Sequence, residues 1–263
     1  MKIKEIVSAL ERFAPLPLQD GFDNAGLQIG LTDAEATGAL LCLDVTEAVI
    51  DEAIMLGYNL VISHHPLIFR GYKSITGKDY VEQCIMKAIK NDIVIYSAHT
   101  NLDNAPEGVN FKIAEKIGLK NVEVLDVKEQ NSCSEIAGAG VIGELEQPEG
   151  ETDFLKRIKK TFEVGCLKHN KLTGREIQRV AICGGAGAFL MPIAIRKQAD
   201  VFITGEIKYH DYFGHDGEIL LAEIGHYESE QYTKEIFQTI IRELFPGLHV
   251  QATRVNTNPI KYM

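Results

Sequence analysis

Two adjacent histidines, His64 and His65, lie where a strand is expected to end, and imidazoles in that position could bind a metal ion. They follow the apolar residues 60–62, which predict a short buried strand, and Pro66 then prevents the backbone from continuing as part of a sheet. Consecutive side chains of a strand point to opposite faces, so both rings reach one site only where the strand gives way to a loop. Two unrelated loop histidines are the alternative, and the dipeptide alone does not decide between them.

Acidic and histidine side chains occupy comparable positions further along the chain. Asp103 follows the next expected strand, residues 93–96, and the carboxyl ends of parallel strands meet at one edge of a sheet, where ligands bind. His226 and Glu230 follow a later strand, and their spacing of four places both on one face of a helix. The apolar stripe of the helix expected to continue from them falls on the same side and consists of Phe237, Ile240, Ile241 and Leu244. An inward carboxylate needs a partner, and a divalent cation is a natural partner for an inward His and Glu.

Three imidazoles and two carboxylates are more ligands than one tetrahedral ion requires. They suit two divalent ions about 3.5–4 Å apart that share a bridging carboxylate and water. Nitrogen and oxygen ligands without a thiolate indicate Zn, Mn, Fe, Co or Ni, and the sequence does not choose among them. The candidate metal ligands are His64, His65, Asp103, His226 and Glu230.

Other polar residues near the expected strand ends are weaker candidates. His99 precedes Asp103 by four residues, and it either orients a ligand or acts as a general acid, with a core histidine as the alternative. Turn or solvent-exposed loop positions are the simpler interpretation for four further residues: Asp23, Asn24, Glu206 and His210.

The elements that position these residues predict an α/β fold. Apolar runs read as buried strands and alternate with helical patterns, which is typical of a parallel sheet covered by helices on both faces. In the first half the strands are expected at 39–43, 60–62 and 93–96, and the helices at 3–14, 47–56, 80–90 and 109–117. The second half repeats strand, helix and strand over 180–203, followed by a strand at 219–221.

Two similar lobes follow from this repetition, each a mostly parallel sheet covered by helices. Lobe one is predicted to comprise residues 1–126 plus 225–263 and to carry most metal ligands, and lobe two to comprise residues 127–224. Residues 126–152, which are Gly-rich and acidic, are expected to be irregular. The Gly184–Gly187 turn lacks the third glycine of a dinucleotide motif, so we expect a tight strand-to-helix turn there.

Composition excludes several classes of function. With 37 acidic and 27 basic residues the formal charge is −10, which argues against a surface that follows nucleic-acid phosphates. Neither a secretory signal nor an apolar run long enough to cross a bilayer is present, so a cytoplasmic protein without a membrane partner is expected. The five cysteines contain no closely spaced pair, which disfavours disulfides and a thiolate zinc site, and we expect Cys42 and Cys183 to be buried thiols.

Four segments together resemble a known family: 23–27, 61–66, 97–103 and 225–230. The chain resembles, over almost its whole length, the dinuclear-metal-centre proteins related to NGG-interacting factor three, often named GTP cyclohydrolase one type two homologues. The resemblance implies a two-lobed α/β protein assembled as a ring-shaped homohexamer. It also implies that the five candidate ligands hold two divalent ions, with Glu230 as the bridge. Some members carry an inserted regulatory domain, for which this chain is too short.

The family name implies hydrolytic opening of the guanine imidazole ring of GTP by a metal-bound hydroxide, since a bound ion lowers the pKa of its water to about 7. A related nucleotide or phosphoester hydrolysis suits the same ligands. A non-enzymatic protein that stores or transfers a divalent ion, or regulates a partner, is the alternative. A nucleic-acid scaffold is disfavoured by the charge.

Overall fold

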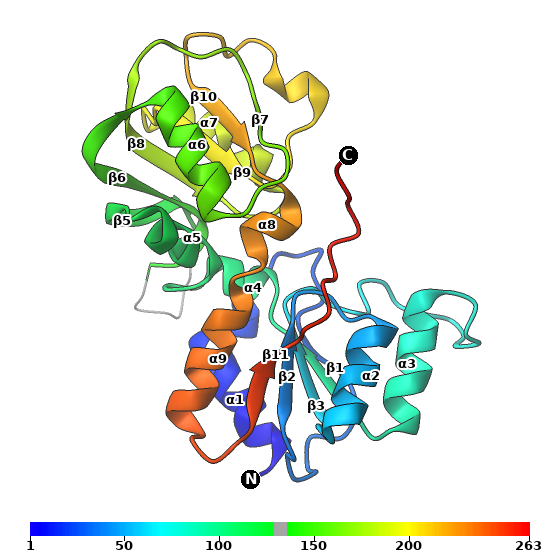
Figure 1. The fold of residues 1–263 in the computed structure, drawn as a ribbon. Helices are drawn as coiled ribbons and strands as arrows, with labels where there is room; N and C mark the ends of the chain where they lie inside the picture. Colours follow the sequence, from blue (N-terminus) through cyan, green and yellow to red (C-terminus); the bar gives the residue numbers. More distant parts are fainter. Residues whose placement is uncertain (129–135) are drawn as a thin grey trace. The chain divides into compact units, whose positions relative to one another are not determined.

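The chain folds as two compact units in a computed structural model that describes residues 1–128 and 136–263. Unit 1 comprises Met1–Leu102 and Thr233–Pro259, and unit 2 comprises Asp103–Tyr232 and Ile260–Met263 (Figure 1). The predicted boundaries between the lobes lie after residues 126 and 224. In the structure the chain passes from unit 1 to unit 2 after Leu102 and returns to unit 1 after Tyr232. Consequently His64 and His65 belong to unit 1, and the other three candidate ligands belong to unit 2.

Unit 1 is an α/β unit with one five-stranded sheet. Its strands are β1 (Gly26–Ile29), β2 (Ala39–Cys42), β3 (Leu60–Ser63), β4 (Val94–Ser97) and β11 (Val250–Ala252). Its helices are α1 (Ile3–Phe13), η1 (Leu16–Leu18), α2 (Glu47–Leu56), α3 (Tyr80–Lys90) and α9 (Thr233–Leu244), with α4 (Thr100–Asn104) at the changeover. The strand order is β1-β4-β3-β2-β11, and only β1 is antiparallel to its neighbour. Helices α2 and α3 cover one face and α1 and α9 the other, as predicted (Figure 1).

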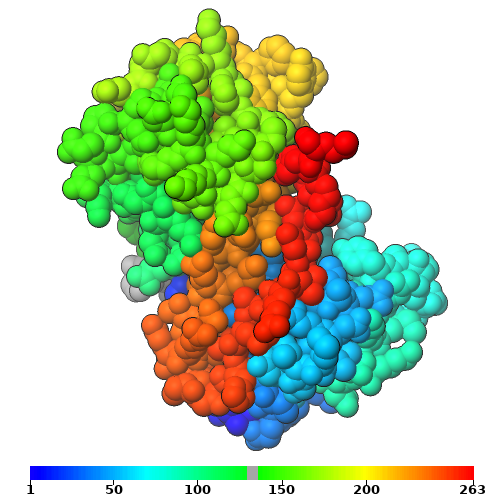
Figure 2. All heavy atoms as spheres, viewed as in Figure 1, coloured from blue at the N-terminus to red at the C-terminus, as the bar shows by residue number. Residues whose placement is uncertain are grey.

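Local sequence signals set both ends of helix α2. Thr46 Oγ1 accepts a hydrogen bond from Val49 N at 3.3 Å and begins α2, and Gly57 ends it in the left-handed region at φ 69°. Such an N-cap contributes about 1 kcal/mol to helix stability. Residues distant in sequence complete the sheet, because β11 pairs with β2. Figure 2 shows the orange and red residues of α9 and β11 against the blue amino-terminal part of unit 1.

Unit 2 contains a six-stranded sheet in the order β5-β6-β8-β9-β10-β7. Its strands are β5 (Lys120–Val127), β6 (Gly138–Gly150), β7 (Lys168–His169), β8 (Glu176–Cys183), β9 (Val201–Thr204) and β10 (Leu220–Glu223). Its helices are α5 (Val109–Ile117), α6 (Glu151–Thr161), η2 (Gly187–Leu190), α7 (Met191–Arg196), η3 (Tyr209–Tyr212) and α8 (His226–Glu230). Only β8, β9 and β10 are mutually parallel, so this sheet is mixed rather than mostly parallel.

The prediction of irregular structure over 126–152 was wrong for the described part of that segment. Strand β6 runs for 13 residues and pairs with β5 and β8. A Cβ at Gly138 would lie 2.0 Å from the carbonyl oxygen of Asp126, so this glycine permits close strand pairing rather than a loop. Residues 129–135 lie outside the described residues.

The helix predicted to continue from His226 is interrupted. Helix α8 ends at Glu230, α9 begins at Thr233, and the two belong to different units. Leu244, the last residue of the predicted apolar stripe, is 54% exposed. Helical periodicity therefore does not explain why Glu230 faces inward, and the cause lies in the loop that packs against it.

Each unit presents polar residues at the carboxyl ends of three neighbouring parallel strands. In unit 1 these strands are β2, β3 and β4, and in unit 2 they are β8, β9 and β10. No helix among the described residues is long and apolar enough to cross a membrane. Cys42 and Cys183 are buried thiols, as predicted.

Candidate metal centre

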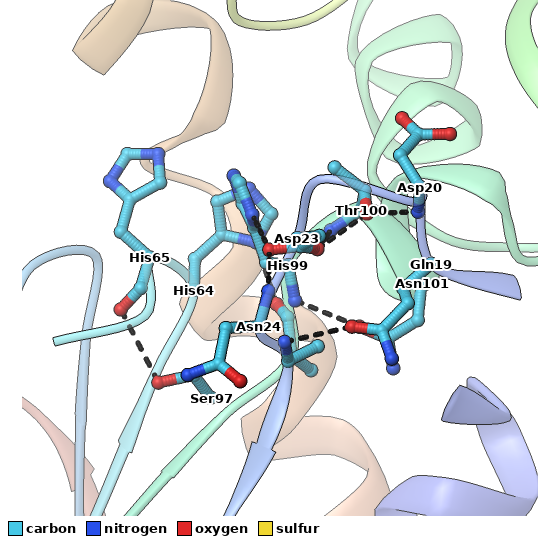
Figure 3. A network of polar contacts seen from close by, with 12 residues as sticks. Gln19, Asp20, Asp23, Asn24, His64, His65, Ser97, His99, Thr100 and Asn101 are labelled. Atoms are coloured by element: carbon cyan, nitrogen blue, oxygen red, sulfur yellow. Dashed lines mark hydrogen bonds and ion pairs between the residues drawn. The ribbon is translucent and has the colours of Figure 1, made fainter. Parts of the chain in front are cut away.

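Three histidines of unit 1 converge at the carboxyl ends of β3 and β4. His64 and His65 follow the last residue of β3, and His99 follows β4 by two residues. One nitrogen of each ring lies within 4.8 Å of the other two, and the ring centroids are 5.0 to 5.4 Å apart (Figure 3). The strand break predicted from Pro66 therefore brings both rings of the dipeptide to one place, and His99 joins them.

The Nδ1 atom of each of these rings forms a hydrogen bond with an oxygen. The partners are the Ala98 carbonyl for His64 at 2.8 Å, Asp44 Oδ1 for His65 at 2.7 Å and Asp23 Oδ1 for His99 at 2.7 Å. A carbonyl or carboxylate oxygen only accepts, so in the neutral rings the proton is on Nδ1. Nε2 is left with the lone pair that binds a metal ion or accepts a proton.

Asp23, a weaker candidate for which a turn was the simpler interpretation of the sequence, lies beside these histidines. Besides His99, it accepts hydrogen bonds from the backbone N and Oγ1 of Thr100 at 3.0 and 2.5 Å (Figure 3). Burial alone would raise the pKa of the Asp23 carboxyl, but the hydrogen bonds from His99 and Thr100 outweigh it and lower the pKa to about 2. Asp23 is therefore an anion that orients His99. Asn24, its neighbour, donates to the carbonyl of Ile68 at 2.5 Å and so ties this loop to the one after β3.

The loop that follows β3 is also held by polar contacts. Ser63 Oγ and Ser97 Oγ donate to the His65 carbonyl at 2.9 and 3.3 Å. Asp44, which orients the His65 ring, in turn accepts from Thr257 Oγ1 at 2.7 Å. Backbone and ring of His65 are thus both fixed, which keeps its Nε2 in one direction.

In unit 2, His226 and Glu230 of α8 contact each other. His226 Nε2 lies 3.0 Å from Glu230 Oε2, and His226 Nδ1 lies 2.8 Å from Glu206 Oε1. An imidazole between two carboxylates needs a proton on each nitrogen, or a cation in place of one proton. Two ligand atoms that each lie about 2 Å from one divalent ion are themselves about 3 Å apart. The contact between His226 and Glu230 therefore matches a pair of metal ligands.

Glu206 is an exposed loop residue, in agreement with the sequence-based interpretation, and it also contacts His226 of this site. Glu206 follows β9 by two residues, and its carboxylate contacts Nδ1 of His226 as the Asp44 carboxylate contacts Nδ1 of His65. His210, from the same loop, is exposed, in agreement with the sequence-based interpretation.

The Gly184–Gly187 turn explains why Glu230 is inward and only 3% exposed. Gly185 adopts a φ of +60°, and a Cβ there would lie 2.2 Å from Glu230 Oε1. Its backbone N donates to Ser229 Oγ at 3.0 Å. The turn is therefore tight, as predicted, and its glycine makes room for the carboxylate rather than for a phosphate.

Asp103 lies in α4, is half-buried and is tied to the same turn through Asn110. Asn110 Nδ2 donates to the Asp103 carbonyl at 3.0 Å, and Asn110 Oδ1 accepts from Gly184 N at 2.9 Å. Unit 1 thus offers imidazole nitrogens, and unit 2 offers an imidazole nitrogen and carboxylate oxygens, which are donor types that divalent transition ions prefer. The donor types and the fixed tautomers fit metal binding.

Comparisons with known proteins identify the family of this chain. The model of the family described as Duf34/NIF3 (NGG1p interacting factor 3) matches residues 1–259. A protein of Lactococcus lactis named GTP cyclohydrolase 1 type 2 homolog is 34% identical over 267 residues, which cover 98% of each chain. A Staphylococcus aureus (strain MRSA252) relative of the same name is 28% identical over 370 positions, so it contains residues without a counterpart in these 263.

Solved structures show the same fold. The crystal structure of S. aureus protein SA1388 matches with a TM-score of 0.90 and 30% identity, over 100% of this chain and 99% of that one. The crystal structure of a Bacillus cereus protein related to NIF3 matches with a TM-score of 0.90 and 26% identity over the same shares of the two chains. The chain therefore belongs to the DUF34/NIF3 family.

Proposed function

We propose that this protein is a divalent-metal-dependent hydrolase that binds two ions per chain and acts on GTP, in a cyclohydrolase-type reaction, or on a related nucleotide or phosphoester. The proposed ligands are His64, His65, Asp103, His226 and Glu230, with Glu230 as the bridge. The observation that carries the proposal is the pairing of histidine Nδ1 atoms with acceptor oxygens, which prepares Nε2 as a metal ligand in both units. The names of the relatives support the reaction type.

The side chains of this protein would divide the work between binding and proton transfer. Bound divalent ions supply a water of lowered pKa and Lewis acidity. Glu206 and Asp44 hold the rings of His226 and His65 in their binding orientation. His99, oriented by Asp23, accepts or donates a proton at Nε2.

Metal analysis of the purified protein tests the ligand assignment. We expect two divalent ions per chain in the wild type, and one or none in Glu230→Gln and in His65→Ala. His249→Ala is the matched control, because His249 is exposed and has no ligand role, and it should keep both ions. An unchanged metal content in Glu230→Gln would refute the site.

Turnover is measured separately, as metal-dependent loss of guanine absorbance from GTP and release of phosphate from a panel of phosphoesters. We expect activity in the wild type and loss of it in His65→Ala. Two bound ions without turnover on any of these compounds would reject the hydrolase and favour the storage or transfer of ions.

We further propose that six copies of this chain assemble as a ring. This proposal is supported by the family membership alone. Light scattering coupled to size-exclusion chromatography should give six times the mass of one chain, and a monomeric mass would reject the ring.

A further inference from the structure

A cavity of about 600 Å³ in unit 2 is lined by none of the five proposed metal ligands. It is formed by η2, the start of α7 and the residues from 206 to 215. Its volume lies in the range of roughly 300–1,000 Å³ that is usual for sites of small organic ligands. The chemistry of its walls indicates which ligand it would take.

Two aromatic rings in the wall are largely uncovered. Phe189 from η2 and Phe213, which follows η3, are 64% and 61% exposed. Phe213 is held by ring contacts with Tyr209 and His210, at centroid distances of 5.4 and 6.2 Å. Stacking of a flat ring, such as a nucleobase, on an exposed phenyl ring is favourable. The cavity therefore favours a planar heterocycle.

A cation lines the same cavity. The Lys208 ammonium forms no hydrogen bond or ion pair with any residue of the described ranges, and it is exposed. His210, two residues later, adds a second side chain that can donate to an anion. A phosphate group of the ligand would satisfy both donors.

The wall of the cavity is held in place before any ligand arrives. Glu223, at the end of β10, accepts from Ile207 N at 3.3 Å, from Tyr212 Oη at 2.8 Å and from Lys168 Nζ at 2.5 Å. The segment that presents Lys208 is therefore fixed at both ends, which lowers the entropy lost on binding.

Glu206 connects the cavity with the metal centre. It lines the cavity, and its carboxylate contacts His226 Nδ1 at 2.8 Å. A ligand in the cavity would therefore lie next to Glu206, the residue that orients the proposed metal ligand His226. A substrate of the proposed metal centre must bind close to these ligands.

We infer that this cavity is the recognition site for a purine nucleotide, whose base stacks on Phe189 and Phe213 and whose phosphate contacts Lys208 and His210. The inference rests on the proposed function, because it identifies the substrate class of that site. The cavity itself contains none of the five proposed metal ligands, so nucleotide binding and metal binding are measured independently.

The test is titration of the full-length protein with GMP by calorimetry, once after chelator treatment and once loaded with Mn²⁺. Phe189→Ala and Phe213→Ala should each raise the Kd of GMP about tenfold. Lys208→Gln should raise it about fivefold at low salt and less at high salt, because an exposed charge pair is weak and screened. Lys208→Gln should leave the Kd of guanosine, which has no phosphate, unchanged.

Matched controls are Tyr80→Ala, an exposed aromatic residue of unit 1, and Lys160→Gln, an exposed lysine of unit 2 that lies outside the cavity. Both should bind GMP like the wild type. Cavity variants that bind GMP as tightly as these controls, or a wild type that binds no GMP in either state, overturn the inference. If the cavity variants weaken GMP binding but the protein binds no divalent ions, only the proposal of a metal-dependent hydrolase is rejected. If the protein binds two ions but the cavity variants leave the Kd of GMP unchanged, only the recognition site is rejected.

Discussion

The Asp23 carboxylate accepts a hydrogen bond from Nδ1 of His99 at 2.7 Å, although 76 residues separate the two in sequence. This contact fixes the tautomer of a histidine whose ring nitrogen lies within 4.8 Å of those of His64 and His65. A carboxylate paired with a histidine in this way controls where a proton is held, and the consequences are measurable.

Replacement of Asp23 by Asn should change the tautomer of His99. The amide of Asn donates to Nδ1 and so favours the proton on Nε2, which removes the lone pair at the site. We expect turnover to fall about 10- to 100-fold, with the metal content unchanged. Nitrogen-15 shifts of the imidazoles report the tautomer directly. Asp33→Asn, which alters an exposed carboxylate, is the control and should change neither quantity. A wild-type tautomer in Asp23→Asn would show that the pair does not act in this way.

Replacement of Gly185 by Ala should expel metal. The new Cβ would lie 2.2 Å from Glu230 Oε1, so the carboxylate must move away from His226. Gly174→Ala is a matched control in the same unit, because Gly174 has a φ of +79° and nothing within 4 Å of an added Cβ. Both variants should lose about 1 kcal/mol of unfolding free energy through backbone strain. Only Gly185→Ala should lose ions in metal analysis, and equal metal contents would contradict the role assigned to this glycine.

Changes at Glu206 should weaken metal binding in two steps. Glu206→Gln keeps an acceptor for His226 Nδ1 but removes the charge, so metal affinity should fall modestly, by about tenfold. Glu206→Ala removes the acceptor as well and should approach a hundredfold loss. Competition with a chelator of known affinity measures both. Equal losses in the two variants would mean that the charge, and not the orientation of the ring, is what matters.

The acid stability of unit 1 should depend on Glu82. Its side chain is fully buried and lies 2.7 Å from Thr76 N and 3.1 Å from Lys78 Nζ. The hydrogen bond from Thr76 and the contacts with Lys78 outweigh burial and lower the pKa of Glu82 from 4.5 to about 2. A lowered carboxyl pKa means that the stabilisation is complete above about pH 4.5 and is lost as the pH falls toward 2.

Glu82→Gln should therefore melt at a lower temperature than the wild type at pH 7, and the difference should shrink between pH 4.5 and 2. Glu115→Gln, an exposed carboxylate, serves as the control. Thermal melts followed by circular dichroism over this range check the prediction. A difference that does not vary with pH would rule out ionisation of Glu82 as its origin.

The elements predicted well are those whose signals are local. Helix α2 has Thr46 and Gly57 at its ends, and β2, β3 and β4 are unbroken apolar runs, so their position and parallel pairing followed from the sequence. Strand β6 was missed because glycines that serve strand pairing look like loop residues, and the break between α8 and α9 was missed because the apolar pattern runs on past it.

The residues that support the candidate site could not be predicted in the same way. His64 and His65 were identified from a strand end and a proline, which are local features. The partners of His99 and His226 are 76 and 20 residues away, and no property of Asp23 or Glu206 in the sequence marks them as partners. Such pairings depend on which strand ends the sheet places side by side. The assignment of all five ligands to one pair of ions stays a prediction.

The sheet of unit 1 has a consequence for how the protein is made. Its edge strand β11 pairs with β2 but is translated after the whole of residues 103–232, which form nearly all of unit 2. On the ribosome, unit 2 is thus free to fold first, while the amino-terminal residues must wait for α9 and β11 to leave the exit tunnel. A chain that ends at residue 232 and has been released from the ribosome should therefore resist protease in its later half and be cut in its earlier one.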